Sequence, residues 1–295
     1  MTDTPVPFPS DAAQPEAVVM DGASALLYWD APRWNDEPTL AIGSFRCTDP
    51  RAGMTLLAQA CEMARARGVA RVIGPMDGDT WHAYRLVTFS DGSPPFRMEP
   101  ESGPHDLVVF RASGFVPVSQ YVSTRAALTT TIGEPPPPID GLTIAPWDGR
   151  NAQALVGKLF AMSSRAFARN AFYKPITREA FLDLYRPVIP AIDPDLVLFA
   201  RSADGEIAGF LFALADATPG TVIVKTYASS VRGCGRLLID TFHRRALAAG
   251  FTDVVHALMH EANDSLDRSA RTGAVAFRRY ALMGRPAGGF PVLAR

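Results

Sequence analysis

Cysteine is scarce in this sequence of 295 residues, and long apolar runs are missing. The three cysteines, Cys47, Cys61 and Cys234, provide neither a disulfide framework nor paired metal-ligand spacing. No window approaches the ~18 uncharged apolar residues that span a bilayer. The first twenty residues lack the basic start and apolar run of a signal peptide. We therefore expect a cytoplasmic protein with no membrane partner and no bound metal.

An excess of charge of one sign is also missing, because 29 basic side chains face 30 acidic ones. Without a global field there is no electrostatic attraction to nucleic acid, so we expect no nucleic-acid partner. Lysine occurs only at Lys158, Lys174 and Lys225, and 29 basic residues less three leave 26 arginines. A bias this uniform is typical of a GC-rich genome and favours a bacterial source.

The length and the prolines indicate two lobes. At roughly 150 residues per domain, the chain can form two cores. Four consecutive prolines, Pro135–Pro138, remove backbone donors and fix φ, which excludes a helix or a central strand there. We predict a polar, disordered tail (1–16), an N-terminal lobe (17–132), a stiff linker (133–141) and a C-terminal lobe (142–295).

The hydrophobic pattern of each lobe predicts a mixed α/β structure. In the N-terminal lobe, strand-like segments precede and follow a helix over 51–67, and a strand over 116–124 comes last. The C-terminal lobe opens with two amphipathic helices and continues as an antiparallel meander over 196–227. A glycine-containing loop, a helix to Ala249, a strand over 253–259 and a helical stretch over 270–283 follow. This order predicts a mixed, mostly antiparallel sheet flanked by helices.

The loop between the last meander strand and its helix carries the clearest chemistry. Its sequence is Ser229-Ser-Val-Arg-Gly-Cys-Gly-Arg236, in which Gly233 and Gly235 permit a tight turn. Free N–H groups at a helix N-terminus bind anions, and Arg232 and Arg236 would add charge-assisted bonds to phosphate. The alternative is an ordinary strand–helix turn with two exposed arginines, and the residues alone do not separate these interpretations.

The segment Arg232-Gly-Cys-Gly-Arg-Leu237 resembles the (Arg/Gln)-x-x-Gly-x-(Gly/Ala) loop of the GNAT N-acetyltransferase superfamily. The order of elements over about 141–285 is similar too, including His260-Glu-Ala-Asn263 after the next strand. The resemblance implies acetyl-CoA as cosubstrate. Its diphosphate would lie on the amides of Arg232, Gly233, Cys234, Gly235 and Arg236, and its pantetheine arm along Lys225, Thr226 and Tyr227 and at Asn263. It also implies that the two strands splay apart to form a slot for the thioester.

Two positions depart from the family pattern. In this register Leu237 stands where Gly or Ala is usual, which would crowd the diphosphate. The general-acid tyrosine that often follows the asparagine by seven residues is replaced by Ala270, and Tyr280 is a candidate substitute or a core aromatic. His260 and Glu261, at the carboxyl end of their strand, are candidate bases or acceptor contacts.

The N-terminal lobe resembles a degenerate copy of the same fold. Its strand, helix and strand over 39–74 follow the family order, but Thr48-Asp-Pro-Arg-Ala-Gly53 replaces the glycine loop. Because a carboxylate repels a diphosphate, we expect no cofactor in this lobe. Trp81, His82, Tyr84 and Arg85 cluster within five residues. They are candidates for acceptor recognition, with lobe packing as the alternative.

These features predict a tandem GNAT-like enzyme that transfers an acetyl group from acetyl-CoA to a primary amine by direct attack. The acceptor would be a small-molecule or peptide amine, and the protein a monomer or homodimer. The alternative function is a non-catalytic acyl-CoA-binding or protein-interaction module with a decayed site. An aminoacyl transferase using charged tRNA is disfavoured by the absence of a basic stripe.

Overall fold

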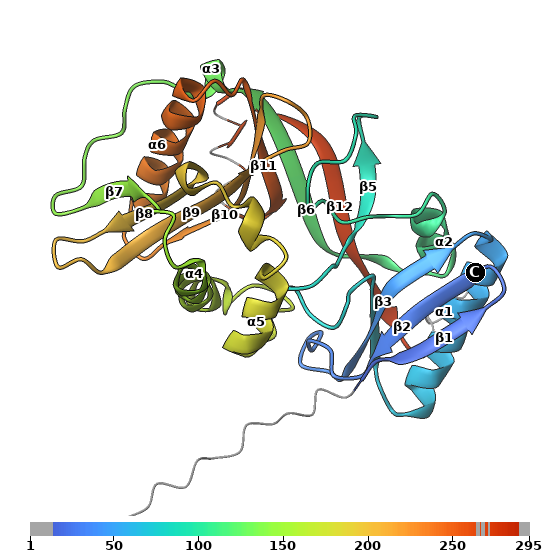
Figure 1. Cartoon of the computed structure of the whole chain (residues 1–295). Helices are drawn as coiled ribbons and strands as arrows, with labels where there is room; N and C mark the ends of the chain where they lie inside the picture. Colours follow the sequence, from blue (N-terminus) through green and yellow to red (C-terminus); the bar gives the residue numbers. More distant parts are fainter. Residues whose placement is uncertain (1–13, 264–265, 267–268, 271, 289–295) are drawn as a thin grey trace, which may run out of the picture. The chain divides into compact units, whose positions relative to one another are not determined.

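The computed structural model of the chain describes residues 14–263, 266, 269, 270 and 272–288. It divides into two compact units. Unit 1 contains the chain up to Leu86, Ser102–Val118 and the segment from Leu282 on, and unit 2 contains Val87–Glu101 and Ser119–Ala281. The structure is a mixed α/β fold whose sheets are mostly antiparallel and flanked by helices (Figure 1).

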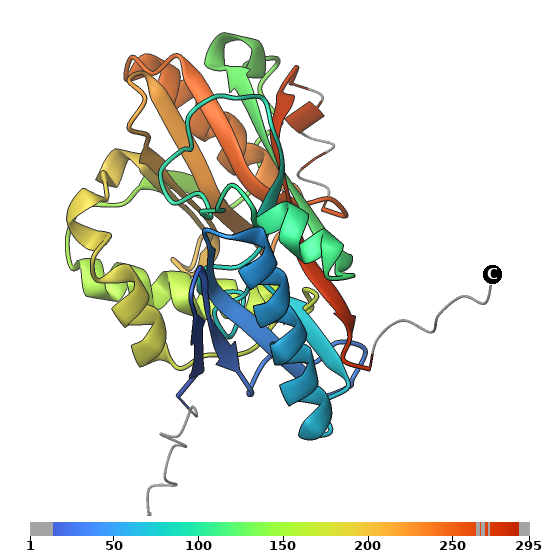
Figure 2. The ribbon, with the colours of Figure 1, turned by 90° about the vertical axis from the view of Figure 1, so that its right-hand side faces the viewer.

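Unit 1 is a sheet with the strand order β1-β2-β3-β4-β12, in which only β3 and β4 are parallel neighbours. Helix α1 joins these two strands and packs against the sheet, as Figure 2 shows. It begins after Asp49 and buries Leu56, Leu57 and Ala60. The elements of this unit are β1 (Glu16–Met20), β2 (Ala23–Tyr28), β3 (Thr39–Cys47), α1 (Pro50–Ala66), β4 (Arg71–Gly74), α2 (Asp106–Ala112) and the end of β12 (Val275–Pro286).

Unit 2 has the strand order β12-β6-β11-β10-β9-β8-β7, with β5 also paired to β12. Strands β10 and β11 are its parallel pair, and α6 connects them. The elements are β5 (Leu86–Ser90), β6 (Val116–Ala127), α3 (Leu128–Thr131), β7 (Thr143–Pro146), α4 (Ala152–Phe167), α5 (Arg178–Tyr185), η1 (Ile189–Ala191), η2 (Pro194–Leu196), β8 (Val197–Arg201), β9 (Ile207–Ala215), β10 (Thr221–Ser229), α6 (Cys234–Ala248) and β11 (Asp253–His260).

Helices cover both faces of the unit 2 sheet (Figure 1). Leu238 and Phe242 of α6 pack into a core with the side chains of one face, among them Val222, Val224 and Val254. On the opposite face, Tyr185 of α5 meets the ring of Phe212 at 6.0 Å. The alternation of side chains along a strand therefore assigns each residue of β10 to one face or the other.

The predicted helical stretch over 270–283 is wrong for most of its length. Residues from Val275 to Pro286 form β12, and Leu282 and Met283 within it are fully buried. A strand that lies inside a sheet is apolar on both faces, so its sequence does not alternate and can imitate a buried helix. Pairing of Met283–Pro286 with Arg71–Gly74 overrides the helix propensity of this segment.

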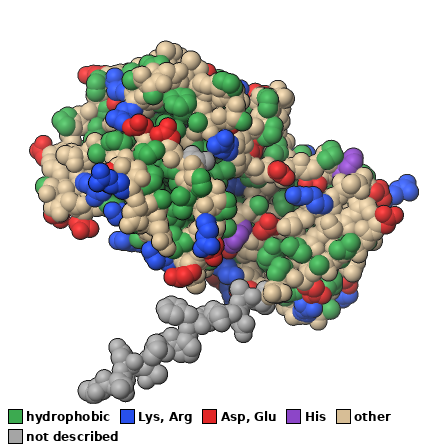
Figure 3. All heavy atoms as spheres, viewed as in Figure 1, with side chains coloured by type: hydrophobic (Ala, Val, Ile, Leu, Met, Phe, Trp, Pro, Cys, Tyr) green, Lys and Arg blue, Asp and Glu red, His purple; other side chains and the backbone are tan. Residues whose placement is uncertain are grey.

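The segment 133–141 forms no helix or strand and belongs to unit 2, where Arg244 donates to the Gly133 carbonyl at 2.6 Å. The predicted tail (1–16) lies outside the described residues up to position 13, and Glu16 already begins β1. No helix among the described residues is long and apolar enough to cross a membrane. Acidic and basic side chains are interspersed on the face that Figure 3 shows.

Candidate functional site

A gap in strand pairing marks the candidate site of unit 2. Strands β10 and β11 pair in parallel from Thr221 and Asp253 only as far as Val224 and His256. Both strands run on, β10 to Ser229 and β11 to His260, and all of these residues are described. Beyond Val224 and His256 the two strands form no pair with each other, and this stretch of β10 and β11 is called the slot.

The loop after β10 ends at Gly233, which directly precedes α6 (Figure 1). Gly233 has a φ of +85°, a left-handed conformation that glycine adopts without strain. It provides no side-chain cap to the helix. Because the first N–H groups of a helix lack intrahelical partners and carry its positive end, this terminus is suited to an anion.

An open depression of about 410 Å³ lies over this helix terminus. It is lined by the end of β10, the loop and the first turn of α6, namely Tyr227, Ala228, Ser229, Ser230, Val231, Arg232, Gly233, Gly235 and Arg236. Arg232 and Arg236 are exposed. The predicted anion loop thus forms a concave surface with two guanidinium groups and the start of α6, which fits a diphosphate.

The geometry favours a different motif register from the one inferred from sequence. Gly233 precedes the helix, and Gly235 lies in its first turn and faces the depression. These positions match the fourth and sixth residues of the family pattern, which places Ser230 first. Leu237 then lies one turn into α6 and outside the lining of the depression. In this register Leu237 is not a motif position, and the departure from the pattern moves to Ser230.

The predicted cofactor residues on β10 divide between the two faces of the sheet. Tyr227 packs against the α6 core, and its ring lies 3.5 Å from a Cβ built on Gly235. Lys225 is the extra residue of a bulge, between the pairs Val224–Ala213 and Thr226–Phe212. Its ammonium donates to the Met98 carbonyl at 3.0 Å. Thr226 pairs with Phe212, which meets α5, so its side chain lies on the face opposite α6.

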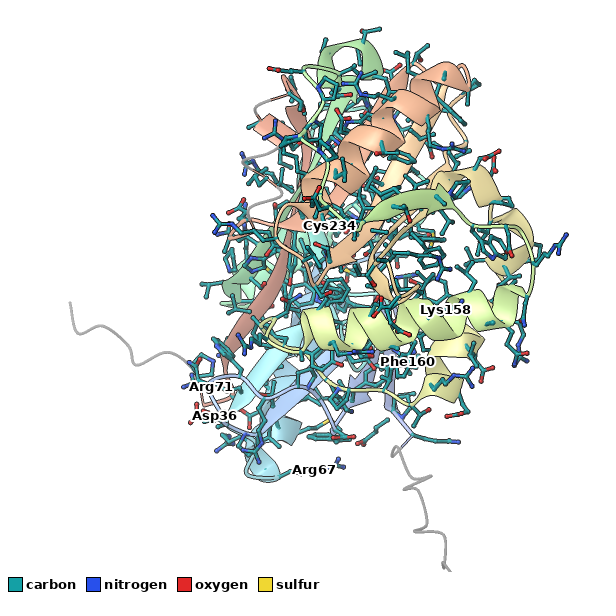
Figure 4. All side chains as sticks on the ribbon, turned by 90° about the vertical axis from the view of Figure 1, so that its left-hand side faces the viewer. Asp36, Arg67, Arg71, Lys158, Phe160 and Cys234 are labelled. Carbon is teal, nitrogen blue, oxygen red and sulfur yellow. The ribbon has the colours of Figure 1, made fainter. Side chains whose placement is uncertain are left out.

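Cys234 begins α6 with its side chain fully buried in the α6 core (Figure 4). Burial raises the pKa of its thiol, and a hydrogen bond from Ser229 lowers it to a smaller extent. The backbone N–H of Cys234 donates to the Val231 carbonyl at 3.2 Å, so neither this N–H nor the buried sulfur is presented to a ligand. Asn263 is exposed in the turn after β11, where its N–H donates to the His260 carbonyl at 2.9 Å.

His260 and Glu261 lie at the mouth of the slot, and both are engaged. The Nδ1 atom of His260 accepts the Ala262 N–H at 3.1 Å, and its ring meets that of Tyr121 edge to face at 5.1 Å. This contact assigns the proton of the neutral ring to Nε2, which makes that nitrogen a donor. The carboxylate of Glu261 pairs with Arg279 at 2.8 Å.

Tyr280 lies in a buried polar cluster of unit 2. Its hydroxyl donates to Glu99 at 2.6 Å, and Glu99 also pairs with Arg278 at 3.1 Å. Burial, and then the hydrogen bond to Glu99, hold the pKa of Tyr280 well above its usual value. A tyrosine in this setting is a weak acid, and its ring is only 1% exposed.

The four aromatic and basic candidates of the N-terminal half lie in unit 1, whereas the anion loop lies in unit 2. They form a compact turn in which Asp79 accepts the backbone N–H groups of Trp81 at 2.8 Å and His82 at 3.1 Å. The Nδ1 atom of His82 lies 2.8 Å from the same carboxylate. Arg85 is buried and stacks over the Tyr84 ring at 3.8 Å.

Unit 1 has the same strand–helix–strand arrangement, but its own carboxylates contact the start of the helix and the end of the first strand. Asp49 caps α1 by accepting the Arg51 and Ala52 N–H groups at 3.1 and 3.2 Å. Asp77 accepts the Ser44 N–H at 2.5 Å beyond the point where β3 and β4 stop pairing. A Cβ on Gly43 would lie 2.3 Å from that carboxylate. These contacts give a physical reason for expecting no cofactor in this unit.

Sequence reasoning missed two buried polar groups of unit 2. In one, Glu99 joins Arg278 and Tyr280. In the other, the Nε2 atoms of His243 and His256 lie 3.1 Å apart, and His256 Nδ1 meets Ser269 at 2.9 Å. The signal available in the sequence was that each histidine stands among apolar residues, His243 on α6 and His256 on β11, which indicates burial. The described residues contain no group of three or more His, Cys, Asp or Glu that could hold a metal ion.

No family model matches the sequence, and no curated protein gives a match. The structure resembles a GCN5-related N-acetyltransferase from Sphaerobacter thermophilus with a TM-score of 0.52 and 18% identity, covering 90% of this chain and 77% of that chain. A tandem GNAT protein of the clavulanic acid biosynthesis pathway gives a TM-score of 0.54 at 14% identity, covering 92% of this chain and 80% of that chain. Eis1 from Mycobacterium abscessus gives a TM-score of 0.53 at 11% identity, covering 93% of this chain and 64% of that chain. The chain therefore has the fold of the tandem GNAT N-acetyltransferases, which confirms at the level of the fold the resemblance drawn from its sequence.

Proposed function

We propose that unit 2 transfers an acetyl group from acetyl-CoA to a primary amine. The observation that carries this proposal is that the depression at the start of α6 includes the end of β10, which forms no pair with β11 beyond Val224 and His256. A diphosphate on the loop would direct the rest of the cofactor along the unpaired end of β10. An anion site alone would fit many phosphates, whereas the adjoining slot favours a long thioester arm.

In this proposal the protein binds the cofactor mainly through its backbone. The N–H groups of Cys234 and Arg236 donate to the Val231 and Gly233 carbonyls at 3.2 and 3.0 Å. The N–H groups of Arg232, Gly233 and Gly235 are therefore proposed to hold the diphosphate, and the guanidinium groups of Arg232 and Arg236 to add charge. The backbone of Lys225, Thr226 and Tyr227 lies beyond the last β10–β11 pair, Val224–His256, and is proposed to pair with the pantetheine amides. Bound acetyl-CoA supplies an activated carbonyl whose C–S bond breaks as a C–N bond forms.

The proposed role of the protein in the chemical step is orientation and handling of protons. The ammonium of the acceptor must lose a proton before attack, and the thiolate that leaves takes one up. His260 presents Nε2–H as a donor and is proposed to orient the acceptor or the acyl oxygen at the mouth of the slot. Glu261, balanced by Arg279, is proposed as a carboxylate that attracts the amine.

The second candidate is an acyl-CoA-binding module without turnover. One observation favours it: each side chain predicted to act as acid or base already has a partner within the protein. Tyr280 is bonded to Glu99, Glu261 to Arg279, and His260 to the Ala262 amide. Both candidates require acyl-CoA binding, so binding alone does not separate them.

Calorimetric titration with acetyl-CoA, followed by thiol release over a panel of small and peptide amines, tests the proposal. Saturable binding with thiol release that depends on the amine supports the transferase. Binding without thiol release on any amine supports the module. Failure to bind acetyl-CoA, CoA or longer acyl-CoA thioesters would exclude both. Arg201→Ala, which removes an arginine of β8 outside the loop, is the control for unspecific loss of charge.

A further inference from the structure

Both strands that border the slot carry a bulge at the level where their pairing ends. On β10 the extra residue is Lys225, directly after Val224 of the last pair. On β11 two residues, Ala257 and Leu258, lie opposite the single residue Ser123 of β6, between the pairs His256–Thr124 and Met259–Val122. A bulge bends and twists its strand, so two bulges at one level turn the strand ends apart.

The β11 bulge has an unfavourable backbone conformation. Leu258 has a φ of +58°, a left-handed conformation that strains a non-glycine residue. Nothing in the local sequence favours this conformation, because position 258 is neither Gly nor Asn. The conformation must therefore be stabilised by contacts with the neighbouring strand.

Ser123 supplies that contact. Its hydroxyl accepts the Leu258 N–H at 2.9 Å and is completely buried. A bulge disrupts the ladder at its extra residue, and a buried N–H must find an acceptor if the fold is to be stable. The serine hydroxyl on β6 thus provides an acceptor for the Leu258 N–H at the bulge.

A chain of buried groups holds the Ser123 hydroxyl in turn. Ser123 hydrogen-bonds the Tyr280 hydroxyl, which donates to Glu99 at 2.6 Å. Arg278, with a 4% exposed side chain, pairs with the same carboxylate at 3.1 Å. The hydrogen bonds therefore run without interruption from the β11 bulge to a buried ion pair, and they leave Ser123 little rotational freedom.

We propose that Ser123 is a positioning residue that keeps β11 bulged at Leu258 and thereby keeps the acyl-CoA slot open. This inference rests on the proposed function, because it assigns a use to the slot. Ser123 acts through the Leu258 amide and touches no reacting atom. Without the hydroxyl, regular pairing of β11 with β6 is favoured. The register of β11 would then shift by one residue, and the side chains of Met259 and His260 would each turn to the other face of the sheet.

The test compares Ser123→Ala with Ser119→Ala. Ser119 is a buried serine on the same strand whose hydroxyl bonds Tyr121 and not the backbone of β11. Acetyl-CoA affinity, amide exchange at Leu258 and melting temperature are measured for each. We expect Ser123→Ala to weaken acetyl-CoA binding about tenfold and to accelerate Leu258 exchange by a similar factor, whereas Ser119→Ala lowers only the melting temperature.

Rescue separates positioning from simple destabilisation. Glycine adopts a positive φ without strain, so Leu258→Gly in the Ser123→Ala protein should restore most of the affinity without restoring the hydroxyl. Leu258→Val, which leaves Ser123 in place but disfavours the bulge, should weaken binding, and it keeps the test decisive if Ser123→Ala does not fold.

Wild-type affinity in a folded Ser123→Ala or Leu258→Val protein would overturn the proposal, as would failure of the Leu258→Gly rescue. If the wild-type protein bound no acyl-CoA, the proposed function would fall, but Leu258 exchange would still be informative. Unchanged exchange in Ser123→Ala would then overturn the role of Ser123 independently.

Discussion

Gly233 and Asp49 hold the same place in the two units: each directly precedes the helix that joins two parallel strands. Gly233 has no side chain and leaves the start of α6 open toward a depression. Asp49 turns its carboxylate onto the first N–H groups of α1. One helix terminus is thus available to an external anion, and the other is neutralised by an internal one.

The first prediction concerns Gly233. Gly233→Ala should abolish most acetyl-CoA binding, because it strains the turn and places a methyl group beside the phosphate-binding amides. Gly205 is the matched control, since it has the same φ of +85° in a turn of unit 2 with open space around it. Gly205→Ala carries similar strain and should bind acetyl-CoA normally. Calorimetry and thermal melting on both variants decide this, and equal loss of binding in the two would contradict the assignment.

The second prediction concerns the closed helix terminus of unit 1. Asp49→Ala should reduce stability by about 1 kcal/mol, because it removes an N-cap that satisfies two amides. Acetyl-CoA affinity should stay within twofold of wild type, since unit 1 is not expected to bind it. Urea unfolding and calorimetry measure the two effects. A large loss of affinity with an intact fold would mean that unit 1 takes part in binding.

Much of unit 2 could be predicted from sequence because its signals are local. The turn glycines, the helix that stops at Gly250 and the apolar strands of the meander each carry their own pattern. The anion loop was found from two glycines and two arginines within five residues. The geometry favours a register two positions earlier, because only the structure shows that Gly233 has the positive φ and precedes the helix.

The buried chain from Leu258 to Arg278 has no such local signal. Glu99 and Tyr280 are 181 positions apart, and Ser123 and Leu258 are 135 apart. Only the order of strands β12, β6 and β11 brings these residues together. The leucine at φ +58° is likewise invisible in sequence, because its conformation is imposed by the neighbouring strand.

The third prediction is a dependence of stability on pH. Burial lowers the pKa of His243 to about 4, and burial followed by the proximity of His243 lowers that of His256 to about 3. Both rings are neutral in the folded state, and below pH 6.5 the unfolded chain binds protons that the folded chain does not. Each histidine should therefore remove about 1.4 kcal/mol of stability per pH unit as the pH falls from 6.5 toward 4.

Urea unfolding between pH 7 and 5 checks this dependence. His243→Gln removes one of the two titrating rings and keeps an amide beside His256, so it should flatten the acid slope by about half. His105→Gln, outside the pair, should leave the slope as in wild type. An unchanged slope in His243→Gln would show that the pair is not its source.

The last prediction separates structure from catalysis at Tyr280. Because its hydroxyl is buried, donates to Glu99 and has a raised pKa, Tyr280→Phe should cost about 1 kcal/mol of stability and change turnover by less than threefold. Glu99→Leu should cost more, about 3 kcal/mol, because Arg278 would lose a buried partner. A general acid would instead contribute roughly 10²–10⁴-fold to the rate. A hundredfold loss of thiol release in a folded Tyr280→Phe protein would therefore indicate that Tyr280 acts as a general acid. Unfolding curves measured together with the kinetics distinguish that result from a loss of stability.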